Sequence, residues 1–410
     1  MSKEERKVPE LRFKGFHDDW EQRKLNTVVE RVTRKNKNNE STLPLTISAQ
    51  DGLVDQNTYF NKQVASKDMS NYYLLKKGDF AYNKSYSNGF PLGTVKRLDK
   101  YDEGTLSSLY IVFRPKKVNS DFLSIYYDTN KWHREVMKLS AEGARNHGLL
   151  NIPVNSFFEK KIIIPILEEE QLKIAKFLKR LEKIITLHQR KINTFKQLKK
   201  SFLSGMFPIK GENIPRLRFN GYKEEWEQRK LGEVTDVRDG THDSPKYFKE
   251  GYPLITSKNL KNDGLDLDNV SLISKEDFNK FNKRSKVHKG DILFGMIGTI
   301  GNPILINRDD FAIKNIALIK QSHEVLNVFI IQLLKSPVFQ SYINRENEGG
   351  TQKFLSLGKI RDFSFKSPNS EEQNAVSNFL RNLDKSIALH QNKVTNLSIL
   401  KTTYLRKMFL

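Results

Sequence analysis

Two long segments of the chain place hydrophobic residues at helical spacing. Successive positions are three or four residues apart, which forms one apolar seam along an α-helix, of the kind that faces a partner helix. Each helix would be about 55–60 Å long at ~1.5 Å per residue. Because a lone seam has to be buried, we predict that the two helices pair antiparallel and that this pairing supports subunit assembly. The seam residues are Leu178, Leu181, Ile185, His188, Ile192, Phe195, Leu383, Ile387, His390, Val394 and Leu397.

Signals for helix ends flank these segments. Gly205 and Pro208 are suited to end the first helix. The run 370–373, Ser-Glu-Glu-Gln, has the pattern of a capping box and predicts the start of the second. Within the seams we interpret His188 and His390 as residues that set helix register, because the eight histidines show no metal-ligand spacing.

The segments between the predicted helices have another pattern. Short β-rich runs lie among Gly, Asn and Asp turn residues, and helical stretches are fewer. We therefore predict a mixed α+β domain in each of these segments. The predicted strands include residues 43–47, 110–113, 161–164, 252–256 and 292–294, and the predicted helices include residues 123–139 and 324–334.

The strongest organisational signal is an internal duplication. Residues 8–28 match residues 214–234 at 12 of 21 positions. Residues 169–207 match residues 371–409 at 17 of 39 positions. Between these matched ends the two halves diverge and share only short anchors, such as Lys-Gly-Asp before a predicted strand in each half.

Similar ends around dissimilar middles indicate one architecture with two different readouts. The alternative interpretation is two drifted copies without functional asymmetry. We predict an α+β fold: two mixed α/β domains separated by two long, antiparallel paired helices, with a pseudo-twofold internal repeat. The predicted boundaries are residues 1–167 for the first domain, 168–207 for the first helix, 208–369 for the second domain and 370–410 for the second helix.

The charge of the chain changes this picture, because it points to a partner. With 70 Lys+Arg against 48 Asp+Glu over 410 residues, the net charge is +22. Such an excess favours a polyanion such as nucleic acid, since phosphate contacts release counterions, although general solubility is the plainer reading. The predicted helices carry +6 and +3 of this charge, so +13 lies elsewhere.

Other features bound the class of protein. The chain has no cysteine, which excludes disulfides and thiolate metal sites. Its charged N-terminus lacks the apolar region of a signal peptide, and no apolar run is long enough to cross a bilayer. We therefore expect a soluble cytosolic protein that binds no membrane.

Motifs for enzymatic chemistry on nucleic acid are missing from the sequence. There is no Walker loop, and Asn302-Pro303-Ile304 lacks the second Pro and the aromatic residue of an amino-methyltransferase motif. The three glycines at 295, 298 and 301 fit a strand–turn better than a cofactor loop. Glu159-Lys160-Lys161 resembles part of a nuclease motif but has no Pro-Asp partner upstream, so we favour a structural role.

These features, in this order and repeated, resemble the specificity subunit of type I restriction–modification enzymes. The resemblance covers nearly the whole chain. Residues 238–260 also look like the start of a target recognition domain of that family. The segments that carry the resemblance are LRFKGFHDDWEQRKL and LRFNGYKEEWEQRKL, KKGDFAYNKSYSNGFPLG and HKGDILFGMIGTIGNP, and the two EEQ…LHQ…MF helices.

The resemblance implies a non-catalytic subunit in the cytoplasm of a bacterium or archaeon. Each divergent middle would be a target recognition domain that reads one half of a split, asymmetric target in double-stranded DNA. The paired helices would act as a spacer and help to dock two methyltransferase subunits. No cofactor or metal would be held by this chain, since S-adenosylmethionine would belong to those partners, and ATP and Mg to the restriction and motor subunits.

Loops that combine hydrogen-bonding side chains with glycine are the candidates for contact with DNA. Arg pairs well with guanine, and Asn or Gln with adenine, in the major groove. Each residue taken alone is better explained as a turn or surface residue, and the loops as groups are better candidates than their single members. The candidates are Lys84, Ser85, Tyr86, Ser87, Asn88, Arg145, Asn146, His147, Arg238, Thr241, His242, Ser257, Lys258, Asn259, Thr351, Gln352 and Lys353.

Two other classes of protein compete with this interpretation. The first is a fragment of a fused restriction–methylation enzyme, which the missing catalytic motifs argue against. The second is a coiled-coil scaffold without a nucleic-acid role. It would bind its partners with little dependence on salt, whereas several phosphate contacts give a steep dependence.

Overall fold

A computed structural model of the chain describes residues 6–85, 89–140, 150, 152–261, 264–297, 300–346 and 354–410. The chain divides into two compact units. The first unit contains Met1–Leu187 and Lys393–Leu410, and the second contains His188–Asn392. Two long helices, α5 (Glu168–Gly205) and α11 (Ser370–Lys407), each contribute one part to each unit.

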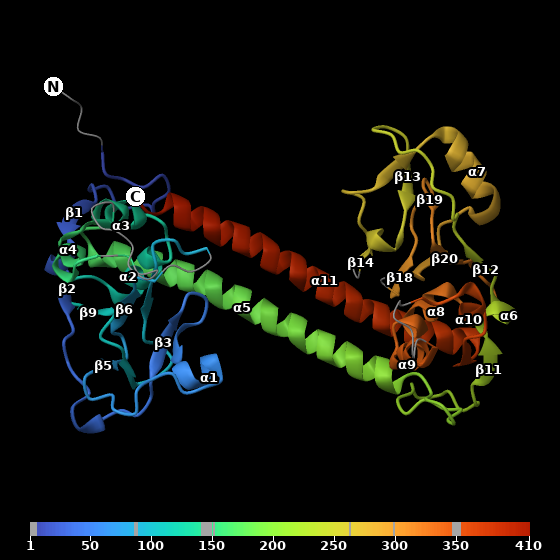
Figure 1. Ribbon diagram of the computed structural model, residues 1–410, viewed down its shortest axis with the longest axis horizontal. Coiled ribbons are helices and arrows are strands. Elements are labelled where there is room, and N and C mark those ends of the chain that lie inside the picture. The colour runs from blue at the N-terminus through green and yellow to red at the C-terminus, as the bar shows by residue number, and fades with distance from the viewer. Residues whose placement is uncertain are drawn as a thin grey trace. The chain divides into compact units, whose positions relative to one another are not determined.

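The first unit combines small antiparallel sheets with short helices (Figure 1). Its central sheet has the strand order β2-β9-β6-β7, and the pairs β3-β4, β5-β8 and β1-β10 form the others. The strands are β1 (Glu21–Lys24), β2 (Val29–Arg31), β3 (Leu45–Ser48), β4 (Gly52–Asp55), β5 (Tyr73–Lys76), β6 (Phe80–Asn83), β7 (Thr94–Arg97), β8 (Glu103–Leu106), β9 (Ile111–Pro115) and β10 (Lys161–Ile164). The helices are α1 (Gln56–Phe60), α2 (Ser120–Tyr127), α3 (His133–Ser140) and α4 (Val154–Glu159).

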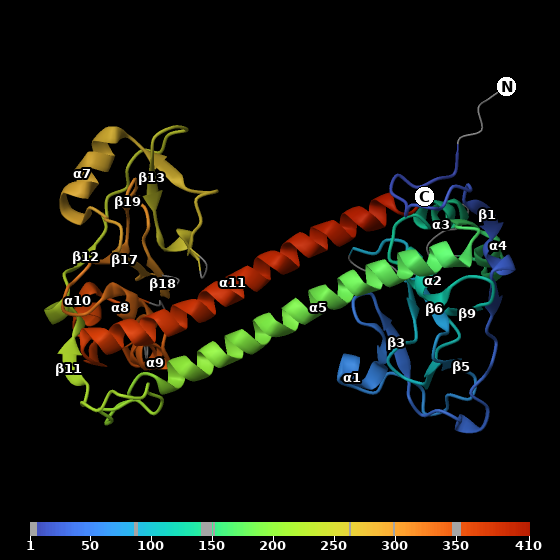
Figure 2. The ribbon, with the colours of Figure 1, turned by 180° about the vertical axis from the view of Figure 1, so that it is seen from behind.

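The second unit repeats the central sheet in the order β12-β20-β17-β18 and adds the sheet β16-β13-β19 (Figure 2). Its strands are β11 (Glu227–Lys230), β12 (Val237–Asp239), β13 (Tyr252–Ile255), β14 (Leu260–Lys261), β15 (Gly264–Leu265), β16 (Ser271–Ile273), β17 (Ile292–Gly295), β18 (Gly301–Leu305), β19 (Ala312–Ile313), β20 (Ile316–Ile319) and β21 (Ser364–Ser367). Its helices are α6 (Leu231–Val234), α7 (Lys275–Ser285), α8 (Asn327–Leu334), α9 (Pro337–Glu346) and α10 (Leu357–Arg361).

The duplicated Glu-Gln-Arg-Lys run has the same role in both units. It forms β1, which pairs antiparallel with β10 in the first unit, and β11, which pairs antiparallel with β21 in the second. Each pair therefore joins the start of a unit to the strand that directly precedes a long helix. This explains why the run is repeated although the segments between the two paired strands differ from unit to unit.

The two long helices run antiparallel within each unit. In the first unit Phe177 of α5 lies edge-on to Tyr404 of α11, with ring centroids 4.9 Å apart. In the second unit Lys199 forms a 2.6 Å ion pair with Asp384, and Phe202 lies 4.7 Å from Phe379. From one contact to the next, the residue numbers in α5 increase while those of their partners in α11 decrease. The predicted antiparallel pairing is therefore confirmed.

The predicted seam residues differ in burial. Leu178, Leu181 and Ile192 are buried, and the other eight are half-buried. His188 and His390 contact each other through their Nδ1 atoms at 3.0 Å, and the His390 ring stacks on Phe195. The histidines therefore make a specific polar contact inside the seam of the second unit.

Each long helix ends in the core of a unit through a repeated Met-Phe pair. At the end of α11, Phe409 lies edge-on to Trp20 in the core of the first unit. After the end of α5, Phe207 makes the same contact with Trp226 in the core of the second. This use as an anchor accounts for the duplicated Met-Phe.

Two local predictions were wrong. The single helix predicted over residues 123–139 is broken into α2 and α3, because Thr129 turns its hydroxyl back to the carbonyl of Tyr126 just after α2 ends. The predicted capping box at Ser370 does not start α11. Asn369 caps the helix instead, since its side-chain oxygen accepts from the backbone N–H of Glu372 at 3.0 Å.

The architecture as a whole agrees with the sequence. Both units are mixtures of helices and strands, and each has its own central four-stranded sheet. Two antiparallel helices contribute to both units. The predicted α+β fold with an internal repeat is confirmed. In the described parts of the chain no helix is long and apolar enough to cross a membrane.

Candidate nucleic-acid interface

The two central sheets can be compared residue by residue. Strands β6 and β17 both follow a Lys-Gly-Asp turn. Phe80 of β6 faces Phe113 of β9, and Ile292 of β17 faces Ile319 of β20. Phe80 therefore corresponds to Ile292, and residues along the two sheets can be matched from this pair.

The Asp of each Lys-Gly-Asp turn is a buried structural carboxylate. Asp79 accepts from Arg34 at 2.8 Å and from Arg114 at 2.7 Å. Asp291 forms an ion pair with Lys320 and accepts from the backbone N–H of Gln321 at 3.0 Å. Buried carboxylates need such partners. The turn therefore fixes where each strand begins, and it is the same in both units although the counter-ions differ.

Loops of unlike sequence begin where these strands end. The backbone N–H of Leu150 donates to the carbonyl of Lys84 at 3.0 Å, directly after β6. In the second unit Leu355 donates to the carbonyl of Met296 at 3.0 Å, directly after β17. The same hydrogen bond thus returns the chain to the same corner of each sheet. We call these two corners the loop edges of the units.

The predicted DNA-contacting residues lie in several places. Lys84 and Ser85 lie at the loop edge of the first unit, directly after β6. The others from the same loops lie outside the described residues, although their segments come back at Leu150 and Leu355. These others are Tyr86, Ser87, Asn88, Arg145, Asn146, His147, Thr351, Gln352 and Lys353.

Arg238, Thr241 and His242 lie at the loop edge of the second unit, at and after the end of β12. His242 contacts Asp239 at 2.8 Å through Nε2 and Asn315 at 2.6 Å through Nδ1. A side chain on the intervening Gly240 is excluded, since its Cβ would lie 2.4 Å from the carbonyl oxygen of Ile313. The tight crossing of these two backbones holds the loop in place.

An ion-pair network covers this second loop edge. Asp239 also pairs with Arg284 of α7, and Lys280 of the same helix binds Asp243 at 2.9 Å. The hydrogen bond between them lowers the pKa of Asp243 and raises the pKa of Lys280. Sequence analysis missed Asn315, whose φ of +54° is unusual for a residue other than glycine and was not readable from the sequence.

The candidates at 257–259 lie elsewhere in the second unit. They form a short 3-10 helix after β13. The side chain of Asn259 already has partners within the fold. Its oxygen accepts from the N–H and hydroxyl of Thr256 at 3.0 Å, and its Nδ2 donates to the backbone carbonyl of Asp266 at 3.1 Å. Ser257 and Lys258 are the members of this group that are half-buried or exposed.

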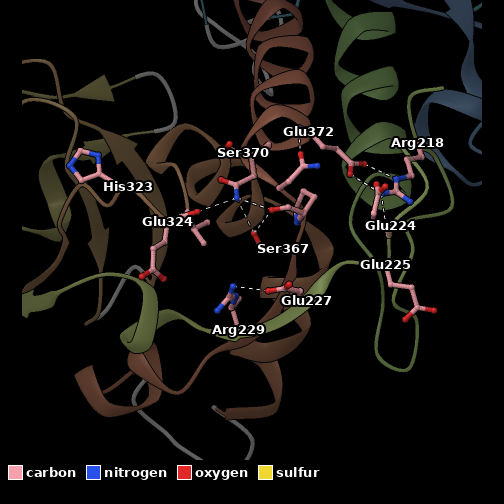
Figure 3. A pocket seen from close by; sticks show the side chains of 14 residues that line it. Arg218, Glu224, Glu225, Glu227, Arg229, His323, Glu324, Ser367, Ser370 and Glu372 are labelled. Carbon is pink, nitrogen blue, oxygen red and sulfur yellow. Dashed lines mark hydrogen bonds and ion pairs between the residues drawn. The ribbon is translucent and has the colours of Figure 1, made fainter. Parts of the chain in front are cut away.

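A pocket of about 410 Å³ lies in the second unit, and Figure 3 shows the side chains that line it. It is formed where the duplicated opening segment meets the start of α11. Its cations are balanced: Arg218 binds Glu372 at 2.8 Å, which raises the Arg218 pKa, and Arg229 binds Glu227 at 2.6 Å. Since further glutamates line it, this pocket is unsuited to a polyanion. No group of three or more metal-binding side chains occurs among the described residues.

Comparison with known proteins defines the class. A family model for the type I restriction modification DNA specificity domain matches residues 17–197 and 223–398. The chain therefore belongs to this family and contains two copies of the domain. With both copies on one chain, it is a specificity subunit of a type I restriction–modification system, as the resemblance implied.

Individual relatives agree with this assignment. The chain is 24% identical over 308 residues to the type I restriction enzyme MjaVIII specificity subunit of Methanocaldococcus jannaschii, which covers 71% of this chain and 70% of that protein. It is 30% identical over 133 residues to the type I restriction enzyme EcoBI specificity subunit of Escherichia coli, covering 32% of this chain and 28% of that protein.

Solved structures share the fold. A type I restriction–modification S subunit from M. genitalium has a TM-score of 0.61 at 16% identity, covering 98% of this chain and 99% of that one. A chain from a study of complex assembly and conformational transition of the type I R-M system has a TM-score of 0.53 at 18% identity, covering 95% and 97%.

Proposed function

We propose that this chain reads a bipartite, asymmetric sequence in double-stranded DNA. Each unit recognises one half of the target through its loop edge, and the two long helices set the gap between the half-sites. The chain has no catalytic role of its own and assembles with two methyltransferase subunits and with restriction and motor subunits. Those partners would carry S-adenosylmethionine, ATP and Mg.

The observation that carries this proposal is the equivalence of the two loop edges. The hydrogen bond from Leu150 to Lys84 and the one from Leu355 to Met296 join distant chain segments at matching places on matching sheets. The loops themselves differ in sequence between the units. A constant scaffold that presents variable polar loops suits the reading of two different half-sites, because base contacts specify sequence and phosphate contacts only position the protein.

The charge distribution supports a DNA partner. Of the net charge of +22, a net +13 lies outside the long helices, in the parts of the chain that contain the sheets and loops. The predicted loop residues at Lys84, Arg238 and Lys258 add to this excess. Lys and Arg near DNA release counterions, which gives affinity without sequence preference.

A domain exchange tests the proposal. Residues 20–165 would be replaced by the corresponding segment of another specificity subunit, and the methylated motif would be read from genomic DNA of cells that contain the whole system. We expect one half-site to change and the other to stay. A change in both half-sites, or in neither, would contradict independent reading by the two units.

A fused restriction–methylation enzyme is the alternative from the sequence, and the family assignment does not favour it. The purified chain, incubated with DNA and S-adenosylmethionine, should transfer no methyl groups until methyltransferase subunits are added. Methyl transfer by the chain alone would reverse this conclusion.

A further inference from the structure

The first unit has a small basic pocket at its loop edge. The pocket has a volume of about 210 Å³. We propose that it is a seat for one backbone phosphate of double-stranded DNA, held by Arg31 and Lys84. This inference rests on the proposed function and deepens it, because it assigns a site that the second unit lacks.

The fold brings the two cations together from distant parts of the sequence. Arg31 is the last residue of β2 and faces Phe113 of β9, which in turn faces Phe80 of β6. Lys84 directly follows the last residue of β6. Arg31 therefore lies level with the start of β6, and Lys84 lies beyond the end of that strand. Both residues line the same pocket, which follows residues 108–112 between them.

The composition of the pocket fits an anion. Its floor includes the buried residues Tyr73, Ile111 and Val112, and Ser108 adds a hydroxyl at the rim. Among the described residues, no carboxylate lines it.

The two cations differ from their neighbours in having no counter-ion among the described residues. Nearby Arg34 and Arg114 are both neutralised by the buried Asp79. By contrast, neither Arg31 nor Lys84 takes part in an ion pair or side-chain hydrogen bond with any part of the chain that the structure describes. Two unpaired cations beside an apolar floor favour an anion such as phosphate, since the low local dielectric strengthens the attraction.

At the equivalent described positions the second unit has no cation. The matched pairs at Phe113 and Ile319 make Val237 the counterpart of Arg31, because each faces that residue. The hydrogen bonds from Leu150 and Leu355 make Met296 the counterpart of Lys84. Valine and methionine are apolar, and both are buried here. The seat is therefore a property of the first unit, and the two units would grip the DNA backbone differently.

Salt-dependent DNA binding by the full chain tests the seat. The affinity for 30-base-pair duplexes of several sequences would be measured by fluorescence anisotropy between ~50 and ~400 mM KCl. Each neutralised phosphate contributes about 0.9 to the slope of log affinity against log salt. We expect Lys84→Met to lower the slope by about 0.9 for every sequence. If the affinities of the wild type and of Lys84→Met converge near 1 M salt, they should differ about eightfold at 0.1 M.

Controls separate the seat from a general loss of charge. Lys77→Met removes one exposed charge at the other end of β6 and should leave the slope close to that of the wild type. Lys84→Arg keeps the charge and should therefore keep the wild-type slope. It provides the second measurement if the methionine variant does not fold. Since both cations hold one phosphate, Arg31→Val with Lys84→Met should also lose about 0.9, whereas two separate phosphates would give about 1.8.

The outcomes distinguish this inference from the proposed function. If the wild-type slope is steep and the Lys84 variant keeps it, the seat is wrong and the proposed function stands. If the wild-type chain in complex with its partners binds DNA without salt dependence, the proposed function fails as well. Loss of ATP binding in the double variant, with unchanged DNA binding, would show a seat for a free phosphate ester and overturn the DNA assignment.

Discussion

Glu170 accepts two hydrogen bonds from the guanidinium group of Arg12, at 2.7 and 2.8 Å, although 158 residues separate them. The indole N–H of Trp20 donates to the same carboxylate at 3.3 Å. The second unit repeats the arrangement with Arg218, Trp226 and Glu372. The duplicated opening segment and the duplicated Glu-Glu-Gln are thus the two halves of one clamp, which fixes the start of each long helix.

The glutamine after each clamp residue adds a further connection. Gln171 accepts from the backbone N–H of Asn119 at 2.8 Å and donates to the carbonyl of Pro165 at 2.9 Å. Gln373 accepts from Leu326 at 2.8 Å and donates to Pro368 at 2.9 Å. The repeated motif therefore joins the opening segment, a helix of the domain and the long helix in both units.

We predict that Glu170→Gln destabilises the first unit. The carboxylate is buried and the Arg12 side chain is only 14% exposed, so the substitution leaves a mostly buried cation without its counter-charge. Loss of one partner of a buried pair costs about 3–5 kcal/mol, and partial exposure of Arg12 puts this case near ~3 kcal/mol. Hydrogen exchange of the full chain should show faster exchange in the first unit.

Glu372→Gln is the matched control and should loosen the second unit in the same way. The double variant Arg12→Met with Glu170→Leu should recover much of the loss, because an apolar pair leaves no buried charge. Unchanged exchange in all three variants would mean that the clamp does not stabilise the fold.

A second prediction concerns Lys160, whose amine is buried in a box of aromatic rings. The amine lies 4.1 Å from the ring centre of Phe157, 4.7 Å from that of Tyr127 and 5.2 Å from that of Trp132. It has no hydrogen-bond partner in the parts of the chain that the structure describes. Burial lowers the Lys160 pKa well below its usual value, and nearby Glu135 opposes this only in part.

The repeat shows what would suit this position. The backbone N–H of Leu25 donates to the carbonyl of Lys160 at 2.9 Å, and in the second unit that of Leu231 donates to Phe363 at 3.0 Å. Phe363 is thus the counterpart of Lys160 and is also buried among aromatic rings. Lys160→Phe should therefore fit the site.

The stability of the wild-type chain should depend on pH through this lysine. The unfolded chain holds the proton up to a pH of about 10.4, whereas the folded chain releases it at its lowered pKa. Between these values the unfolded state binds more protons, so the free energy of unfolding rises with pH by up to about 1.4 kcal/mol per unit. Below the lowered pKa the destabilisation is fully present.

Thermal unfolding from pH 6 to 10 measures this effect. Lys160→Phe should raise the melting temperature of the first unit and remove the rise with pH. Lys161→Met, at the exposed neighbouring residue, is the control and should keep the wild-type profile. Parallel profiles for the wild type and Lys160→Phe would count against a buried, deprotonated amine.

The third prediction tests the helix seam. Ile192 is buried between the long helices in the second unit, and proline there removes a helical hydrogen bond and clashes with the preceding turn, at ~3 kcal/mol or more. Ile192→Pro should reduce the recovery of a complex with both methyltransferase subunits. Co-purification from cells measures this yield.

A milder pair of variants separates seam contacts from helix breakage. Ile192→Ala should cost about 2–4 kcal/mol through the cavity it leaves. Leu187→Ala, at a residue that is 52% exposed, should cost far less. Equal effects of the two alanine variants on stability would refute a buried seam at Ile192.

The last prediction concerns the gap between the half-sites and rests on the proposed role of the helices as a spacer. Four helical residues would be inserted after Leu187 of α5 and four after Asn392 of α11. These points lie between the Glu182–Lys401 contact and the His188–His390 contact, so each unit keeps its own contacts. Each helix grows by ~6 Å, and the preferred gap should widen by one or two base pairs at ~3.4 Å each.

Insertion of two residues in each helix is the control. It adds about half a helical turn and should mostly abolish binding, because the part of the chain beyond it is rotated away from the DNA. The methylated motif in genomic DNA reports both variants. An active four-residue variant with the original gap would mean that another feature sets the spacing.

Much of this protein was readable from its sequence alone. The seam spacing predicted both long helices and their antiparallel pairing, and the duplication predicted one architecture used twice. The loop candidates near Lys84 and Arg238 could be named because hydrogen-bonding side chains stand there beside glycine, and their contact with DNA stays a prediction. These features depend on residues close in sequence, or on comparison of the chain with itself.

The tertiary structure decided which distant residues meet. Nothing in the sequence joined Arg12 to Glu170, placed Lys160 inside an aromatic box, or set Arg31 and Lys84 around one pocket, because strand order in the central sheet is not sequence order. Hydrophobic periodicity reports which face of an element is buried, but not which element covers it. That choice depends on how all the elements fit together, and here it creates the clamp, the buried amine and the basic pocket.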